Sequence, residues 1–255
     1  MSNLDSFVQS SRPPPKAVAT SQELRDRGSI FVGNVYRATS PEEARAAVRH
    51  QKLVMHADKP AYEISAWRCM VLKHGKTGLE GPDDFELKVG SDDDGEQWGG
   101  NKVLKTMHSE GLIDAVVIVS RWYGGTMLGP ARFTHIETCV REVSRTFKRL
   151  EEMEECISTL TTLDDLLADL RSELNSISST STDTIPFSSP QESSLDTLKS
   201  ARIAEIKKAI KPDYSAMQKD VDLAKARRLI TARENAIKSV KTLLTRKNSA
   251  EHIST

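Results

Sequence analysis

The chain has 255 residues, and its 36 basic and 36 acidic side chains give a formal net charge of zero at pH 7. This length suits one or two domains. Because the charges balance, the net charge alone does not point to any class of partner. The hydrophobic share of 38% lies below the roughly 45–50% of a typical globular domain. We therefore expect part of the chain to contribute little to a core.

The cysteine pattern and the lengths of the apolar runs indicate the cellular compartment and whether the protein spans a membrane. Cys69, Cys139 and Cys156 stand far apart without a CxxC pair, which predicts reduced thiols rather than a zinc site. No run approaches the roughly 18 apolar residues of a membrane span, and the polar N-terminus has no signal-peptide core. These features predict a cytoplasmic protein with no membrane partner, and nothing in the sequence calls for a cofactor.

In chain order, the sequence first predicts a flexible polar arm at residues 1–27, which includes three consecutive prolines. Alternation over residues 29–38 then predicts a strand. Ser40 and Pro41 suit the cap and first turn of a helix, because a serine oxygen can accept a hydrogen bond from a free backbone N–H there. That helix is expected to bury its small apolar residues, Ala44, Ala47 and Val48.

A second strand is expected over residues 61–72, and the Gly- and Asp-rich residues 74–97 are predicted to form an exposed loop. A helix from about residue 101 should end at Gly111, since glycine tolerates the left-handed conformation of a helix end. The apolar, β-branched residues 113–120 predict a central strand.

A third helix is expected from Gly129 and Pro130, with apolar side chains every three or four residues as far as Leu150. Strands that alternate with helices predict an α/β domain over residues 28–149. The apolar spacing changes phase near residue 150. Either one helix continues with a local distortion, or the domain ends there and a second helix begins.

The C-terminal part is predicted to be mostly helical and coiled-coil-like. It comprises an acidic heptad helix at 150–175, a Ser/Thr/Pro linker at 176–194, a basic helical region at 195–247 and a tail at 248–255. The acidic helix has eight acidic residues and one basic, while the basic region from residue 199 onward has fourteen basic and five acidic. These opposite charges predict two helices that fold back antiparallel, either within one chain or through self-association of two chains.

Three segments resemble those of a known family. The longest is VVIVSRWYGGTMLGPARFTHI at residues 116–136. The second is DDGE at residues 93–96, which two glycines follow, and the third is His56 with the later pair Ala61-Tyr62. In their order and spacing, over about 120 residues, these segments resemble the IMPACT family of translation regulators. The chain departs from the family pattern at Glu63, where the family has arginine, and at Gln97-Trp98, where the family has smaller residues.

The resemblance implies a two-layer α/β (α+β) sandwich, like a domain of a small-subunit ribosomal protein and of translocase-type elongation factors. It also implies a non-enzymatic regulatory or adaptor protein in translational control or amino-acid-starvation (stress) signalling. The implied partners are a translation factor, a kinase-pathway protein or the ribosome. Longer relatives dampen the amino-acid-sensing kinase largely through an N-terminal acidic RWD domain. We expect a short member without that domain, because 27 polar residues precede the α/β domain.

The glycine-rich turn before the third helix suggests a binding site. Gly124, Gly125 and Gly129 precede a helix N-terminus, with Arg121 and Arg132 close in sequence. Free backbone N–H groups, the helix dipole and arginines suit an anion such as a phosphate or an RNA backbone. The other interpretation is a tight turn that needs glycine dihedrals. An RNA- or anion-binding protein that uses this loop and the basic helices is the alternative function.

A polar cluster is expected to accompany the family motifs. Its members stand at element ends or in loops, and they are His56, Tyr62, Asp93, Asp94 and Glu96. A metal or hydrolytic site is one interpretation, but no nucleophile has an adjacent base. The favoured interpretation is structural, with Asp94 or Glu96 capping a helix or pairing with Arg121. We therefore predict no catalytic residue and no metal ligand.

Overall fold

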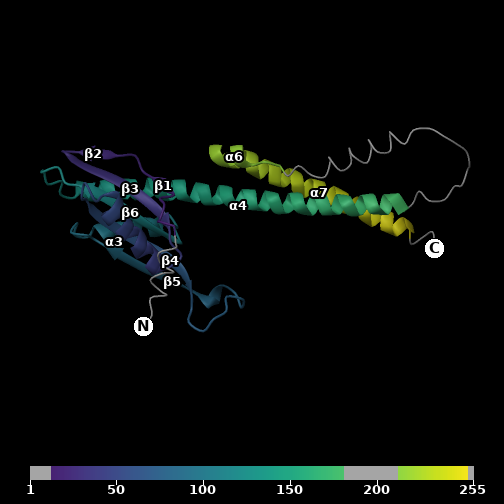
Figure 1. Cartoon of the computed structure of the whole chain (residues 1–255), viewed down its shortest axis with the longest axis horizontal. Helices are drawn as coiled ribbons and strands as arrows, with labels where there is room; N and C mark the ends of the chain where they lie inside the picture. The colour runs from purple at the N-terminus through teal and green to yellow at the C-terminus, as the bar shows by residue number, and fades with distance from the viewer. Residues whose placement is uncertain (1–12, 181–211, 252–255) are drawn as a thin grey trace, which may run out of the picture. The chain divides into compact units, whose positions relative to one another are not determined.

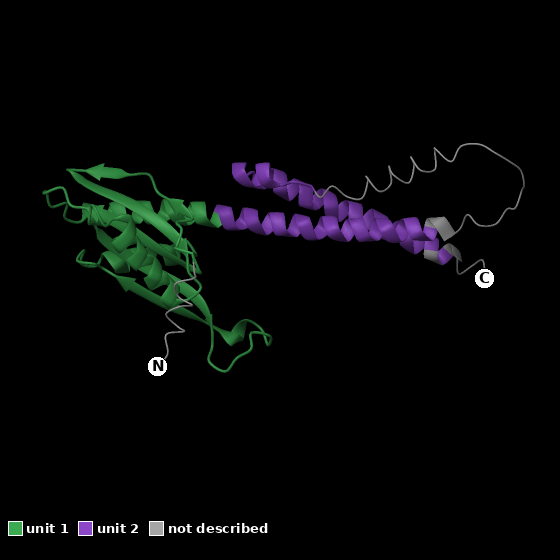
Figure 2. Cartoon of the chain, in the orientation of Figure 1, with its two compact units in different colours: residues 1–148 green, residues 149–255 purple. Residues whose placement is uncertain are grey.

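The computed structural model describes residues 13–180 and 212–251. Figure 2 divides the chain into two compact units, residues 1–148 and residues 149–255, and each is described here by itself. Within the described ranges, no helix combines the length and the apolarity that crossing a bilayer requires.

The first unit is built on an antiparallel sheet (Figure 1). Its strands are β1 (Ala19–Thr20), β2 (Leu24–Asp26), β3 (Ser29–Arg37), β4 (Tyr62–Leu72), β5 (Phe85–Asp92) and β6 (Ala115–Trp122). They lie in the order β1-β3-β6-β4-β5, and β2 also pairs with β3. Almost every residue of β6 is buried, so the central strand predicted from its apolar, β-branched sequence is confirmed.

Both faces of the sheet carry helices. α3 (Gly99–Ser109) and the first part of α4 (Ala131–Thr180) cover one face and enclose the larger core. α2 (Pro41–His50) packs on the other face against residues that include Tyr36 and Trp67. The mixed α/β class predicted from the sequence is confirmed, and α2 adds a layer to the two-layer description.

The start of α2 follows from its sequence. The Ser40 side chain accepts a hydrogen bond from the backbone N–H of Glu43 at 3.2 Å, so the predicted cap is confirmed. The Glu43 carboxylate in turn accepts from the backbone N–H of Thr39 at 2.9 Å. Two free donors at the helix start are thereby satisfied. After α2 the chain continues as a π-helical turn, Gln51–Met55, which carries the Gln51 side chain into the interior.

The exposed loop predicted at residues 74–97 is wrong in its second half. That stretch contains a 3-10 turn, Pro82–Asp84, and strand β5, which pairs with β4 along its whole length. Apolar residues alternate along β5, but the strand lies at the edge of the sheet and leaves them exposed. The alternation of Phe85, Leu87 and Val89 is the pattern of a strand, but the glycines and aspartates on either side of it favoured a loop.

Among the residues that the structure describes, the second unit consists of three helices. α4 continues without a break to Thr180, so of the two possibilities near residue 150 the structure has the single helix. α6 (Ser215–Asp220) and α7 (Leu223–Glu251) pack against it around a core that includes Met153, Leu160 and Ala226.

The acidic part of α4 and the basic α7 are joined by ion pairs between Arg227 and Glu152 and between Arg233 and Asp164. The paired positions rise together along both helices, which therefore run parallel, as Figure 1 shows. The predicted antiparallel arrangement is wrong. Two antiparallel helices can be joined by a short connection, whereas two parallel helices need a connection about as long as a helix. Residues 181–211 provide enough chain for this longer connection between α4 and α7. Residues 181–211, which include most of the predicted linker, lie outside the described residues.

Candidate functional site

The glycine loop and the DDGE segment meet at the end of β6. Arg121, near the end of that strand, and Arg132, in the first turn of α4, both pair with the carboxylate of Glu96. The distance from Arg132 Nε to Glu96 Oε1 is 2.8 Å, and the side chains of Arg121 and Glu96 are only 6% and 5% exposed. Because a buried charge without its partner is strongly destabilising, this triad is a structural element of the domain.

Aromatic rings also flank the guanidinium of Arg121. Its Cζ atom lies 5.4 Å from the ring centre of Phe31 and 5.5 Å from that of Tyr123, distances at which cation–π attraction operates. Its Nε has no hydrogen-bond partner among the groups that the structure describes. Arg121 is thus held by Glu96 and by two rings, which leaves little of its charge for an external ligand.

Each glycine of the loop has a backbone reason to be glycine. A Cβ atom on Gly124 would lie 1.9 Å from the carbonyl carbon of Gly28, so the two backbones are in contact. Gly125 and Gly129 have φ angles of 83° and 57°, a region that side chains disfavour. The tight-turn interpretation therefore accounts for all three glycines. The space beside Gly125 and Gly129 is open, so an anion site there remains a proposal.

A second buried network surrounds Glu63, which the sequence marked only as a departure from the family pattern. The Glu63 carboxylate is 1% exposed, lies 2.6 Å from His56 Nδ1, and accepts a 2.6 Å hydrogen bond from the Ser120 hydroxyl. Gln51 connects His56 to the hydroxyl of Tyr36. Burial, with a contribution from the Glu63 charge, raises the pKa of Tyr36 to about 12. A charged residue inside an apolar strand pattern was the signal that could have found this network.

The two aspartates of the DDGE segment bind backbone amides. Asp93 accepts hydrogen bonds from the N–H groups of Trp98 and Gly100 at 2.9 and 2.8 Å, and so caps the start of α3. Asp94 accepts from the backbone N–H of Glu63 at 2.8 Å. Of the polar residues predicted to cluster, His56 and Asp94 thus contact Glu63, Glu96 pairs with the two arginines, Asp93 binds the amides at the start of α3, and Tyr62 is exposed.

Ser120, Glu63 and His56 do not form a catalytic triad. The carboxylate lies between the hydroxyl and the imidazole, so the imidazole is not placed to take the hydroxyl proton. Ser120 is also completely buried. Over residues 13–180 and 212–251, no group of His, Cys, Asp and Glu side chains is placed to hold a metal ion. The arrangement is suited to holding loops in position.

Four large side chains around the Glu96 triad are exposed. We call them the aromatic surface, and they are Tyr62, Trp98, Tyr123 and Met127. Tyr62 stands opposite Arg121 in the β4–β6 register, and the ring of Tyr123 lies over the Arg121 guanidinium. Trp98 follows Glu96 by two residues, and Met127 belongs to the glycine loop. Since Trp98 is 61% and Met127 77% exposed, the surface presents apolar area to solvent over a buried ionic layer.

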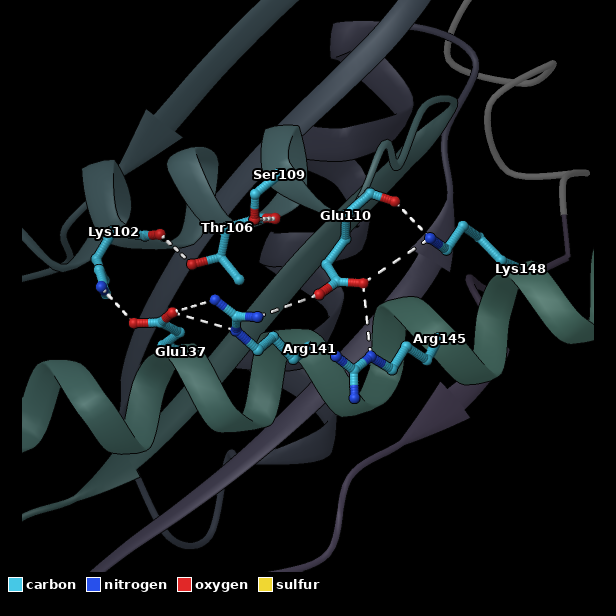
Figure 3. Close-up of polar contacts among 8 residues, drawn as sticks. All are labelled: Lys102, Thr106, Ser109, Glu110, Glu137, Arg141, Arg145 and Lys148. Carbon is cyan, nitrogen blue, oxygen red and sulfur yellow. Dashed lines mark hydrogen bonds and ion pairs between the residues drawn. The ribbon is translucent and has the colours of Figure 1, made fainter.

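Polar contacts connect α3 and the residue that follows it to α4 (Figure 3). Glu137 of α4 pairs with Lys102 of α3 and with Arg141. Glu110, at the end of α3, pairs at 3.6 to 3.8 Å with three basic side chains of α4, Arg141, Arg145 and Lys148. Hydrogen bonds from Lys102 and Arg141 lower the pKa of the Glu137 carboxyl.

Known proteins match the first unit. The family model of the Impact N-terminal domain matches residues 27–144. A protein IMPACT homolog of Saccharomyces cerevisiae is 33% identical over 129 residues, and the protein IMPACT of Bos taurus is 48% identical over 123 residues. These alignments cover 51% and 47% of this chain but 46% and 35% of the relatives. The chain therefore spans less than half the length of these curated relatives.

A solved structure of a two-domain translational regulator is 32% identical to this chain, with a TM-score of 0.33. The match covers 50% of this chain and 46% of that one. The family match at residues 27–144 includes the glycine loop, the DDGE segment and both buried networks. By these residues, the first unit of the chain contains an Impact N-terminal domain, similar to that of the IMPACT proteins.

Proposed function

We propose that this protein is a non-enzymatic adaptor in translational control, which binds a protein partner through the aromatic surface. The observation that carries the proposal is the exposure of Trp98, Tyr123 and Met127 around the buried ion pair of Arg121 and Glu96. Tyrosine, tryptophan and methionine are enriched at protein interfaces, and tryptophan and tyrosine often supply most of the binding energy.

The buried layer explains why this surface suits recognition. Glu96 holds Arg121 and Arg132 together, and Asp93 fixes the turn that carries Trp98. A surface that is already ordered loses less conformational entropy when it binds. The polar groups beneath it are engaged with one another, which supports a docking role over a chemical reaction.

The partner class in this proposal is a translation factor, a kinase-pathway protein or the ribosome, in a response to amino-acid starvation. The family supports translational regulation at a coarse level, since one matched structure is that of a translational regulator. The particular partner belongs to the proposal.

The test is co-purification from cells, with and without RNase, of the parent and of a Trp98→Ser/Met127→Ser variant. We expect RNase-resistant translation partners that the variant loses, with the melting temperature unchanged. Leu79→Ser is a matched control, because Leu79 is a highly exposed apolar residue outside the aromatic surface. Retention of all partners by the double variant would contradict the proposal.

The second candidate function is RNA or anion binding at the glycine loop. It is favoured by the open space beside Gly125 and Gly129 and by the absence of acidic side chains from the first turn of α4. Exposed aromatic rings also stack on single-stranded bases. Partners that RNase removes would favour this function.

A further inference from the structure

The outer part of the sheet is uncovered on the face that α3 and α4 cover elsewhere. Arg68, Met70 and Leu72 of β4 stand opposite Val89, Leu87 and Phe85 of β5, so these six side chains share one face. All five apolar members of this set are exposed, and Val89 is 52% exposed. The helical layer of the first unit therefore ends at α3, while the apolar face beneath it continues to the sheet edge.

A groove of about 310 Å³ lies between β5 and α3 on this face. Three of its lining residues are apolar, Leu87, Val89 and Leu104, and three are basic, Arg68, Lys105 and His108. No acidic side chain lines it among the residues that the structure describes.

The basic side chains of this groove differ in their ion pairing from the basic side chains on the other side of α3. The network of Figure 3 engages the basic side chains there with Glu110 and Glu137. In the groove, Arg68 is fixed by a 2.7 Å hydrogen bond to the backbone carbonyl of Leu112. Within residues 13–180 and 212–251, no carboxylate forms a salt bridge with Arg68, Lys105 or His108. The groove thus combines an apolar floor with positive charge that a partner can complement.

We propose that this groove docks an amphipathic, acidic helix of a partner protein. Apolar anchors at helical spacing would cover Leu87, Val89 and Leu104, and flanking carboxylates would face Lys105 and His108. Complementary charge selects the acidic partner, while burial of the apolar anchors supplies affinity. This site is separate from the aromatic surface and does not depend on the function proposed for it.

A helix fits this face better than an extended segment. A strand added to β5 would lie in the plane of the sheet and leave Leu87 and Val89 open. A helix beside α3 would instead continue the layer that α4 and α3 begin, and it would cover the exposed apolar face.

The test uses the full chain and three synthetic peptides that share one set of leucines at helical spacing. Their flanking residues are glutamate, glutamine or lysine. We expect fluorescence anisotropy to show that the glutamate peptide binds, and circular dichroism to show that it becomes more helical on binding. Its affinity should fall as the salt concentration rises. Because charge complementarity selects the partner, the glutamine peptide should bind roughly tenfold more weakly, and the lysine peptide more weakly still.

Variants locate the site. Val89→Glu and Lys105→Glu should each weaken binding of the glutamate peptide by roughly tenfold or more, because each places a like charge in the groove. Lys88→Glu is the matched control, since Lys88 lies on the same strand and faces away from the groove. Trp98→Ser in the aromatic surface should leave peptide binding unchanged. Circular dichroism of each variant checks that it is folded.

Several results would overturn the proposal. One is binding of the lysine peptide as tight as that of the glutamate peptide, and another is the failure of all three to bind. Unchanged affinity in both groove variants would also overturn it. So would a dimer of the parent, found by analytical ultracentrifugation, that Val89→Glu abolishes, because the occupant would then be a second copy. Competition by single-stranded RNA for the groove would assign it to nucleic acid.

Discussion

The Nδ1 atom of His56 lies 2.6 Å from a carboxylate oxygen of Glu63. The imidazole ring also packs edge to face against Trp122, with 4.9 Å between ring centres, so the contact is enclosed on one side by an indole. On the other side of the same carboxylate, Ser120 donates a hydrogen bond. A single buried acidic side chain thus joins β4, β6 and the turn after α2.

We expect Glu63→Ala to lower the free energy of unfolding by about 3 kcal/mol, because it leaves buried polar groups without their partner. Glu63→Gln keeps an acceptor for Ser120 and should cost less. Urea denaturation of both variants measures the difference. Glu86→Gln, on an exposed edge strand, serves as the control. A free energy for Glu63→Ala equal to that of the parent would show that the network does not stabilise the domain.

Arg121→Ala should destabilise the domain more than Arg132→Ala. Arg121 is buried against Glu96, so its loss removes a partner of the buried carboxylate. We expect this to lower the free energy of unfolding by about 3 kcal/mol. Arg132 is more exposed and should cost about 1 kcal/mol or less. Paired melting curves and salt-titrated RNA-binding curves separate the two interpretations of the glycine loop. If Arg121→Ala weakens RNA binding while the melting temperature holds, the anion site gains support and the structural interpretation fails.

The contribution of Glu137 to stability should disappear in acid. Hydrogen bonds from Lys102 and Arg141 hold the pKa of Glu137 below its ordinary value of 4.5. A carboxyl whose pKa is lowered in the folded state stabilises the fold above the unfolded pKa, and this contribution is lost as pH falls through the folded pKa. Glu137→Gln should therefore lower the free energy of unfolding at neutral pH by about 0.5 kcal/mol, since solvent screens the pair. In strong acid, urea curves of parent and variant should coincide, and a persistent difference would contradict this account.

Tyr36 should make the domain sensitive to alkali. Its pKa rises from 10.0 to about 12, mainly because the hydroxyl is buried. The unfolded chain then releases the proton first, so stability falls as pH rises from the unfolded value toward the folded one. Tyr36→Phe should reduce this alkaline loss, although it also removes the hydrogen bond to Gln51. Urea curves across the alkaline range, read beside tyrosinate absorbance, measure the effect, and equal slopes for parent and variant would refute it.

Local signals predicted much of the fold. The Ser40 cap follows from backbone chemistry within four residues, and β6 follows from a run of β-branched residues. Strand β5 was not predicted because only three alternating apolar residues mark it, between stretches of glycine and aspartate that are typical of a loop. The direction of α7 was wrong because charge pairing favours contact between two helices without fixing which way they run.

The sequence predicted that Asp94 or Glu96 could pair with Arg121, and the Arg121–Glu96 pair confirms the second of these. The motifs place Glu96, Arg121 and Asp93 in one region, yet nothing local specifies which carboxylate reaches which arginine. Those pairings depend on distances between β6, α3 and α4 that arise only in the folded domain. The sequence marked Glu63 only as a departure from the family pattern, and its network was not predicted because its partners, His56 and Ser120, are 7 and 57 residues away along the chain.

Because the backbones of Gly28 and Gly124 are in contact, a displacement of the glycine loop should also change the β2–β3 turn. The direct contact, together with the 3.2 Å hydrogen bond from the Gly124 N–H to the Ser29 hydroxyl, couples the two turns. A partner that displaces the loop must also displace the turn, together with the Asp26 carboxylate that lies 2.8 Å from His135 Nε2. The Gly28 amide resonance should therefore register occupancy of the aromatic surface, although Gly28 belongs to a different turn from any residue that a partner would touch.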